Sequence, residues 1–134
     1  MLFRSLLVCF SCNKNSPKSA CGTQVCTDLF ASVGVMFKDK DNNPVSVIKY
    51  SVVDLRTNDT LKNIISTTAN LVAGAYIVVD DSNLKDLSPG GDNLKVSGTN
   101  PATNQVATAT IKVSGGACNC HVEWVSGPQT ITFN

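Results

Sequence analysis

The amino-acid sequence predicts an all-β protein that folds as a single antiparallel β-sandwich of about seven to eight strands. Short stretches rich in β-branched and aromatic residues alternate between apolar and polar positions, which is the pattern of half-buried strands. Asp, Asn, Gly and Pro recur between these stretches at intervals of about 8 to 12 residues, as turns do in sandwiches. The chain of 134 residues is long enough for one domain.

Two strands are expected at the start of the domain, over residues 27–38 and 45–55. The first is followed by the turn 39–44, whose Asp and Asn residues tolerate left-handed backbone conformations. The second is β-branched and aromatic and ends at the turn 56–59. The alternating apolar residues of the first strand, which should share one buried face, are Leu29, Ala31, Val33, Val35 and Phe37.

The middle of the chain predicts two further strands and a loop. Residues 61–71 combine helical spacing with a β-branched run, and we expect a strand there. Residues 75–80 follow Gly74 and read as a short buried strand. Residues 81–92 form a loop with one helical turn at Leu84 to Leu87.

The last part of the chain continues the strand pattern. Residues 94–98 and 106–114 are expected strands, and the second alternates small or apolar residues with threonine and lysine. The final strand region, 119–133, is interrupted at Ser126-Gly127-Pro128. The aromatic residues expected in the core are Tyr50, Tyr76 and Trp124.

The first twelve residues resemble a bacterial lipoprotein signal. Arg4 precedes an apolar run, and Ser11 stands directly before Cys12. The run is far shorter than the about 20 residues of a membrane-spanning helix, so a transmembrane anchor is excluded as its interpretation. The resemblance implies cleavage before Cys12 and lipid attachment to its sulfur. A buried first strand is the alternative interpretation of the apolar run.

These features divide the chain into three parts. Residues 1–11 are the expected lipoprotein signal peptide, residues 12–25 the lipidated cysteine with a flexible tether, and residues 26–134 the β-sandwich domain. We therefore expect an exported protein, an outer-membrane or periplasm-facing lipoprotein of a Gram-negative bacterium, held to the membrane by its N-terminal lipid.

Four cysteines remain when Cys9 leaves with the signal and Cys12 carries the lipid; they are Cys21, Cys26, Cys118 and Cys120. An even number in an oxidising compartment favours disulfides, with three possible pairings. Pairing of the two neighbouring C-terminal cysteines would strain a local loop, so long-range bridges are preferred. A bridge between the start and the end of the domain closes a loop of roughly 90 residues, which stabilises by about 4 to 5 kcal/mol in the chain-entropy model.

A metal site is the alternative interpretation of the C-terminal cysteines. Cys118, Cys120 and His121 offer three soft ligands within four residues, which zinc or copper would accept. The two-residue spacing is tighter than in common zinc sites, and an oxidising compartment converts thiols to disulfides. We expect disulfides here, and no cofactor.

Catalysis would have to use His121, the only histidine. Cys120 and His121 point to opposite faces of an extended strand, and no Gly-x-Ser-x-Gly turn is present to hold a serine nucleophile. Glu123 shares the expected strand face of His121, which gives at most an exposed acid and base pair. The sequence therefore predicts a protein that is not an enzyme.

Two other patterns have a functional and a structural interpretation. Residues 39–43 resemble half of a calcium loop, but Pro44 stands at the glycine position, so we interpret them as a hairpin turn. The aspartates Asp80, Asp81, Asp86 and Asp92 are interpreted as turn caps rather than calcium ligands. Asp59-Thr60-Leu61 matches a short O-glycosylation sequon of some bacterial envelope proteins, which makes Thr60 a possible glycosylation site.

Two segments resemble transthyretin-like sandwiches known as carboxypeptidase regulatory-like domains. Residues 33–45 match their first strand, polar turn and Pro-Val start of strand two, and residues 71–79 match their Leu-x-x-Gly-x-Tyr strand. Asn42-Asn43 replaces the usual Asp-Gly, and the Cys118 to His121 segment lies outside the family pattern. The resemblance implies a transthyretin-like or immunoglobulin-like Greek-key topology and a noncatalytic role.

The composition indicates which classes of partner the chain can bind. The formal net charge is +1 and the 11 basic residues are scattered, so no surface is expected to bind nucleic acid. The combined expectation is a noncatalytic envelope module that binds a membrane through its lipid and an envelope protein or glycan through its loops or edge strands.

Overall fold

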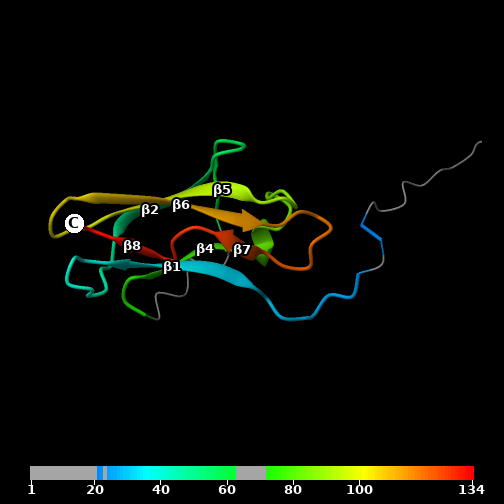
Figure 1. Cartoon of the computed structure of the whole chain (residues 1–134), viewed down its shortest axis with the longest axis horizontal. Helices are drawn as coiled ribbons and strands as arrows, with labels where there is room; N and C mark the ends of the chain where they lie inside the picture. The colour runs from blue at the N-terminus through cyan, green and yellow to red at the C-terminus, as the bar shows by residue number, and fades with distance from the viewer. Residues whose placement is uncertain (1–20, 23, 63–71) are drawn as a thin grey trace, which may run out of the picture.

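The computed structural model describes residues 21, 22, 24–62 and 72–134, and within them the fold is two β-sheets facing each other (Figure 1). The predicted all-β sandwich is confirmed, with eight strands in the described residues. The predicted signal, Cys12 and most of the strand expected over residues 61–71 lie outside the described residues. Among those described, no helix is long and apolar enough to cross a membrane.

The smaller sheet is formed by the first strand, a middle strand and the last strand. Its order is β4-β1-β8, with β1 antiparallel to β4 and parallel to β8. The strands are β1 (Ser32–Lys38), β4 (Ala75–Asp80) and β8 (Thr130–Thr132). The alternation predicted for β1 is confirmed, because Val33, Val35 and Phe37 are all buried.

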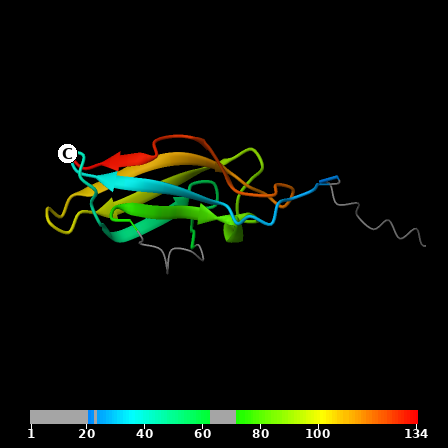
Figure 2. The same ribbon diagram turned by 90° about the horizontal axis from the view of Figure 1, so that it is seen from below.

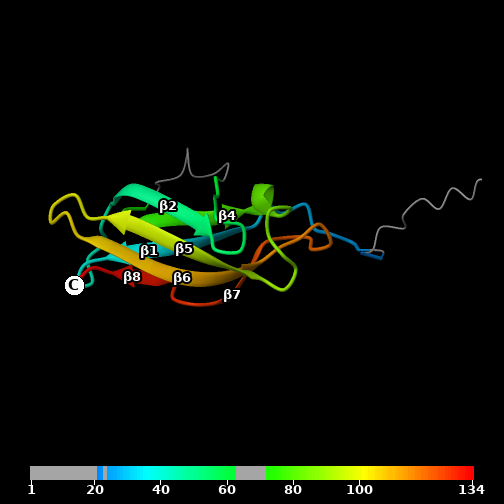
Figure 3. The ribbon, with the colours of Figure 1, turned by 90° about the horizontal axis from the view of Figure 1, so that it is seen from above.

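The larger sheet has the order β3-β2-β5-β6-β7, and its long central strands are seen in Figure 3. Its longest ladder joins β5 and β6 in register from Asp92↔Val113 to Thr99↔Val106. The strands are β2 (Ile48–Asp54), β3 (Asp59–Thr60), β5 (Asp92–Thr99), β6 (Val106–Ser114) and β7 (Glu123–Ser126). The bounds of β6 are those predicted from its alternation, and the predicted break at 126–128 separates β7 from β8.

Figure 1 shows the two sheets as layers one above the other, and the view from below looks onto the smaller sheet with the larger one behind it (Figure 2). Apolar side chains fill the space between the sheets. Phe37 is fully buried and its ring contacts those of Tyr50 and Tyr76 edge-on. Burial raises the pKa of Tyr50, whose hydroxyl donates to Ile77 O at 2.9 Å. Both tyrosines are half-buried against the core, which agrees with their predicted position.

The segment 44–47 crosses from one sheet to the other, so the strand predicted over residues 45–55 begins only at Ile48. Val45 N donates to Phe37 O in β1 at 2.9 Å, whereas Ile48 pairs with Thr99 in β5. The hydroxyl of Tyr76 accepts from Val47 N at 2.8 Å and donates to Val47 O at 3.2 Å. A tyrosine from β4 thus satisfies the backbone at the crossing, where no strand neighbour is present among the described residues.

Trp124 was expected in the core, and this prediction is wrong because 42% of its surface is exposed. It lies in β7, an edge strand in which every residue is exposed. Trp124 pairs with Val113 of β6, but β7 has no strand neighbour on its other side within the described sheet, so the tryptophan stays partly exposed although the buried Val122 precedes it by two positions.

Two expectations near the strand ends are also corrected. Leu29 was placed on the buried face, but it precedes the start of β1 and is exposed. The helical turn expected at Leu84 to Leu87 is instead a 3-10 helix, η2 (Asp81–Asn83), whose C-cap residue is Leu84. The side chain of Asp80 caps this helix by accepting from Ser82 N at 2.8 Å.

Candidate functional site

Two disulfides join the start of the described chain to the loop between β6 and β7. Cys21 pairs with Cys118 and Cys26 with Cys120, at sequence separations of 97 and 94 residues. The sequence left the long-range pairing open, and the structure contains these two bridges rather than the neighbour pair. We call residues 21, 22 and 24–31 the N-terminal arm, which lies at the end of the sandwich far from the C-terminus (Figure 1).

The loop that receives the arm is held against η2 and the turn after it. Gly115 N donates to Ser88 O at 3.0 Å, and Gly116 N donates to Leu84 O. Gly116 has a φ of +95°, and a Cβ there would lie 2.7 Å from the Pro89 ring. Only glycine fits both the backbone conformation and the close approach, so the two glycines fix where the disulfide loop lies.

A hydroxyl, an imidazole and a carboxylate meet beside the second disulfide. His121 Nε2 lies 2.9 Å from Thr27 Oγ1, and His121 Nδ1 lies 2.7 Å from Asp81 Oδ2. Thr27 and His121 directly follow Cys26 and Cys120, so the disulfide between those cysteines brings the two residues together. Asp81 also accepts from Val122 N at 2.9 Å and from Ala31 N at 2.8 Å.

The protonation of Asp81 fixes the direction of these hydrogen bonds. Burial raises the pKa of Asp81, but the hydrogen bonds from Ala31 N, His121 and Val122 N outweigh this effect and hold the pKa below its usual range. An ionised carboxylate only accepts, so His121 Nδ1 is the donor to Asp81. When the imidazole is neutral, its Nε2 accepts from the Thr27 hydroxyl.

This arrangement has the contacts of a hydroxyl activated by a base, and it lies outside the best-formed cavities of the described residues. Thr27, Asp81 and His121 do not line any of three well-formed cavities in the part of the chain that the structure describes. Catalysis by a hydroxyl nucleophile needs a carbonyl held within about 3.5 Å of the attacking oxygen. We therefore interpret the three residues as a polar clasp that fixes the N-terminal arm.

Replacing the imidazole should loosen the clasp measurably. We expect His121→Ala to lower the free energy of unfolding by about 1 to 2 kcal/mol, because two side-chain hydrogen bonds are lost while Asp81 keeps its two backbone donors. Thr27→Val removes only one of these bonds and should have a smaller effect. Urea unfolding followed by Trp124 fluorescence measures both, and equal stability of all three proteins would contradict the clasp.

The alternative metal interpretation does not fit the arrangement of its residues. The sulfurs of Cys118 and Cys120 are shared with Cys21 and Cys26, and the imidazole of His121 faces Thr27 and Asp81. In the part of the chain that the structure describes, no three His, Cys, Asp or Glu side chains lie close enough to hold a metal.

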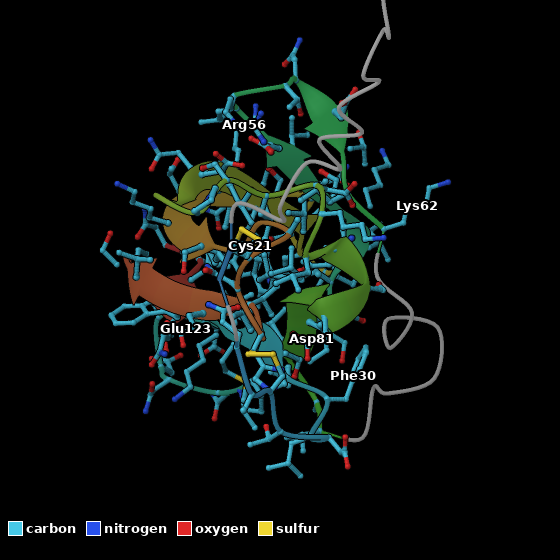
Figure 4. The ribbon with its side chains drawn as sticks, turned by 90° about the vertical axis from the view of Figure 1, so that its right-hand side faces the viewer. Cys21, Phe30, Arg56, Lys62, Asp81 and Glu123 are labelled. Atoms are coloured by element: carbon cyan, nitrogen blue, oxygen red, sulfur yellow. A yellow bond between two sulfur atoms is a disulfide. The ribbon has the colours of Figure 1, made fainter. Side chains whose placement is uncertain are left out.

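A second polar cluster lies at the ends of β2 and β5 and is centred on Arg56, which Figure 4 labels. Arg56 Nε donates to Asp92 Oδ1 at 2.8 Å, and Arg56 Nη2 donates to Asp92 Oδ2 at 2.9 Å. Asp92 also accepts from the backbone and hydroxyl of Ser88. The hydrogen bond from Arg56 is the main reason that the pKa of Asp92 falls to about 2. This aspartate is therefore a structural acceptor, and its hydrogen bonds from Ser88 agree with its interpretation as a turn cap.

Asp54 shares this cluster and is fully buried. Its Oδ1 accepts from Arg56 N at 2.8 Å, whereas its Oδ2 has no hydrogen-bond partner and lies 3.8 Å from Arg56 Nη2. Burial raises the pKa of Asp54, and the neighbouring Asp92 carboxylate raises it further against the opposing effect of Arg56. The sequence did not single out Asp54, because an aspartate at the end of a strand resembles any other turn residue.

An open cavity of about 360 Å³ borders this cluster. Its lining includes the cations Arg56, Lys62 and Lys85 and the hydroxyl of Thr60. Thr60 lies in β3, at the edge of the larger sheet, and its side chain is exposed. The position suits a modification enzyme, and the glycosylation of Thr60 stays a prediction.

The turn after β1 has the geometry of a hairpin turn. Asp39 Oδ1 accepts from Asp41 N and Asn43 N, both at 2.9 Å, and Asp39 N donates to Asn43 O at 2.9 Å. Asn42 has a φ of +68°, a left-handed conformation that Asn tolerates. The hydrogen bond from Asn43 N is the main cause that lowers the pKa of Asp39. Its carboxylate is satisfied within the turn, as the hairpin interpretation predicted.

Sequence reasoning singled out His121 but missed its partners Thr27 and Asp81. These lie 94 and 40 residues away along the chain, and only the disulfide and the fold of η2 bring them together. Glu123, the partner considered from the sequence, has an exposed side chain in β7. Comparison of the chain with protein-family models, with curated proteins and with solved structures finds no match.

Proposed function

We propose that the chain is a lipid-anchored protein of the bacterial cell envelope whose β-sandwich has a noncatalytic, binding role. The observation that carries this proposal is the pair of disulfides at Cys21 and Cys26, which lie a short distance in sequence after the lipoprotein-like Cys12. Disulfides persist in oxidising compartments outside the cytosol, and export through a signal ending before Cys12 leads there.

The polar clasp supports the noncatalytic part of the proposal. His121 is the only histidine of the chain, and its contacts to Thr27 and Asp81 hold the arm in place away from the cavities. The resemblance of residues 33–45 and 71–79 to transthyretin-like, carboxypeptidase regulatory-like domains points the same way, since those domains are generally appendages. Exposed loops and the edge strand β7 are the surfaces through which an envelope protein or a glycan would bind.

Lipidation is tested in cells of a Gram-negative host. We expect the full chain to incorporate labelled palmitate and to fractionate with membranes, and Cys12→Ser to abolish both. Cys9→Ser is the matched control, because it removes a neighbouring thiol but leaves the residue that the signal exposes. Label on the Cys12→Ser variant, or a labelled product still carrying residues 1–11, would contradict the proposed anchor.

The noncatalytic role is tested with the same purified protein. We expect no turnover of ester, amide or glycoside substrates above the level of His121→Ala. A hydrolytic activity that is lost in both His121→Ala and Thr27→Val would overturn this part of the proposal, because it would show that the clasp acts as a base and nucleophile.

A further inference from the structure

The N-terminal arm carries three exposed apolar side chains close together in sequence. Val25 is 95% exposed, Leu29 77% and Phe30 54%. The only charged residue between Cys21 and Ala31 is Asp28, so only one charged side chain in this stretch would lose water if the surface were covered. Single exposed apolar residues are ordinary, but a local group on one arm is typical of a binding surface.

The backbone that presents these side chains is fixed at several points. Two disulfides hold the arm at Cys21 and Cys26, Thr27 contacts His121, and Ala31 N donates to Asp81 Oδ2 at 2.8 Å. A surface on a fixed backbone loses little conformational entropy when it binds. The arm is therefore preorganised to present its apolar side chains outward. A segment that lacked these contacts would have to become ordered on binding.

The length of chain before the arm indicates what covers it. On the proposed function a lipid is attached at Cys12, and only nine positions separate Cys12 from Cys21. Nine residues span at most about 30 Å even when fully extended. The arm end of the sandwich, onto which Figure 4 looks, thus stays close to the bilayer and meets its surface at high effective concentration.

We propose that the N-terminal arm docks on the lipid bilayer and places Val25, Leu29 and Phe30 in the membrane interface. Apolar side chains partition into this region, and a second, weak contact supplements a lipid anchor. The β5–β6 loop (residues 100–105) and the C-terminus lie at the other end of the sandwich in Figure 1. Docking of the arm therefore holds the domain end-on, with that loop directed away from the membrane. This inference rests on the proposed lipid anchor.

The test uses a single tryptophan as a reporter of depth. In a chain that begins at Cys12, Trp124 is replaced by phenylalanine, and tryptophan is introduced as Leu29→Trp in the arm or as Val106→Trp at the start of β6. The four other cysteines form disulfides, so the Cys12 thiol is the one available for coupling to a maleimide lipid. Both proteins are coupled to phosphatidylcholine vesicles that contain brominated acyl chains, which quench only nearby indoles.

We expect the emission of the Leu29→Trp protein to shift to shorter wavelength on the vesicles and to be quenched by the brominated lipid. The matched Val106→Trp protein, whose position is 63% exposed in the structure, should keep its emission in water. Adding Phe30→Ser and Val25→Ser to the Leu29→Trp protein should reduce its quenching. Equal behaviour of the two reporters, or water-like emission of the arm reporter, overturns the docking.

The two proposals fail in different ways. Chemical coupling supplies the lipid, so docking is measured whether or not cells lipidate Cys12. Palmitate incorporation without quenching of the arm reporter would contradict the docking of the arm but not the lipid anchor. Quenching without palmitate incorporation would leave a membrane-active arm on a chain that is not a lipoprotein. A count of free thiols before coupling confirms that each variant has formed both disulfides.

Discussion

Removing both disulfides should lower the free energy of unfolding by about 7 kcal/mol, whereas removing either one should lower it by only about 2.5 kcal/mol. The bridges Cys21–Cys118 and Cys26–Cys120 close loops of 97 and 94 residues, and either alone corresponds to about 4.7 kcal/mol in the chain-entropy model. However, the two closed loops share almost all of their residues. Five positions separate Cys21 from Cys26 and two separate Cys118 from Cys120, so the second bridge closes a ring of only about 8 residues.

Paired serine substitutions measure this difference. The variants Cys21→Ser with Cys118→Ser, and Cys26→Ser with Cys120→Ser, should each remain folded in urea titrations. The fourfold variant should be marginal or unfolded, because small domains have about 5 to 15 kcal/mol of stability in total. Losses of about 4 to 5 kcal/mol for each pair separately would show that the loops act independently and would contradict the shared-loop account.

Asp92→Ala should lower the free energy of unfolding by about 2 to 4 kcal/mol. The buried Asp92 carboxylate accepts two of the three side-chain hydrogen bonds of Arg56 and two from Ser88, and its removal leaves Asp54 as the remaining acid beside the guanidinium. Asp28→Ala, at an exposed position, is the control and should change the free energy by less than about 0.5 kcal/mol. An equal, small effect of both substitutions would contradict a structural role of the cluster.

The substitution Asp54→Asn should have the opposite effect at neutral pH. Asparagine keeps the Oδ1 acceptor for Arg56 N and carries no charge, so it removes the cost of burying a carboxylate and the repulsion from Asp92 that together raise the pKa of Asp54. Because the pKa of Asp54 is raised, its contribution to stability is present below its unfolded pKa of about 3.9 and is lost as pH rises through the folded pKa. The variant should therefore be the more stable protein at pH 7, and its advantage should disappear below about pH 4.

The contribution of Asp92 to stability changes with pH in the opposite direction to that of Asp54. Its folded pKa of about 2 lies below the unfolded value of about 3.9, so its contribution is full above about pH 4 and is lost as pH falls towards 2. Urea unfolding between pH 2 and pH 7 should show that the free energy of unfolding of the natural protein falls steeply from about pH 4 to pH 2. The fall should be shallower for Asp92→Ala. Parallel curves for the two proteins would contradict the lowered pKa of Asp92.

The alternation of small residues and threonines predicted β6 with its bounds, because a strand with one buried face repeats every second residue. The same rule failed for Trp124, since alternation along a strand does not tell whether that strand lies at the edge of its sheet, as β7 does. It also failed for Leu29, which precedes the strand. The local sequence pattern thus predicted the strands and most of the core. It did not predict which strand lies at a sheet edge or at which residue a strand begins.

The residues of the polar clasp could be predicted only in part. His121 is conspicuous as the only histidine, whereas Thr27 and Asp81 have no local signal that relates them to it. Their meeting depends on which cysteines pair, and four cysteines leave that choice open. Likewise, the raised pKa of Asp54 follows from its burial beside Asp92. Neither the burial nor the proximity can be predicted from the positions of charged residues in the sequence.

The parallel pairing of β1 with β8 has a consequence for the order of folding. Met36 in β1 lies opposite Thr130 in β8, so the first strand completes its sheet only with the last residues of the chain. Contacts of such high sequence separation slow folding, because the chain must close a long loop before they form. A chain that emerges N-terminus first therefore cannot complete its smaller sheet until residues 130–132 have emerged. This delay agrees with the export proposed above, in which the polypeptide crosses a membrane unfolded.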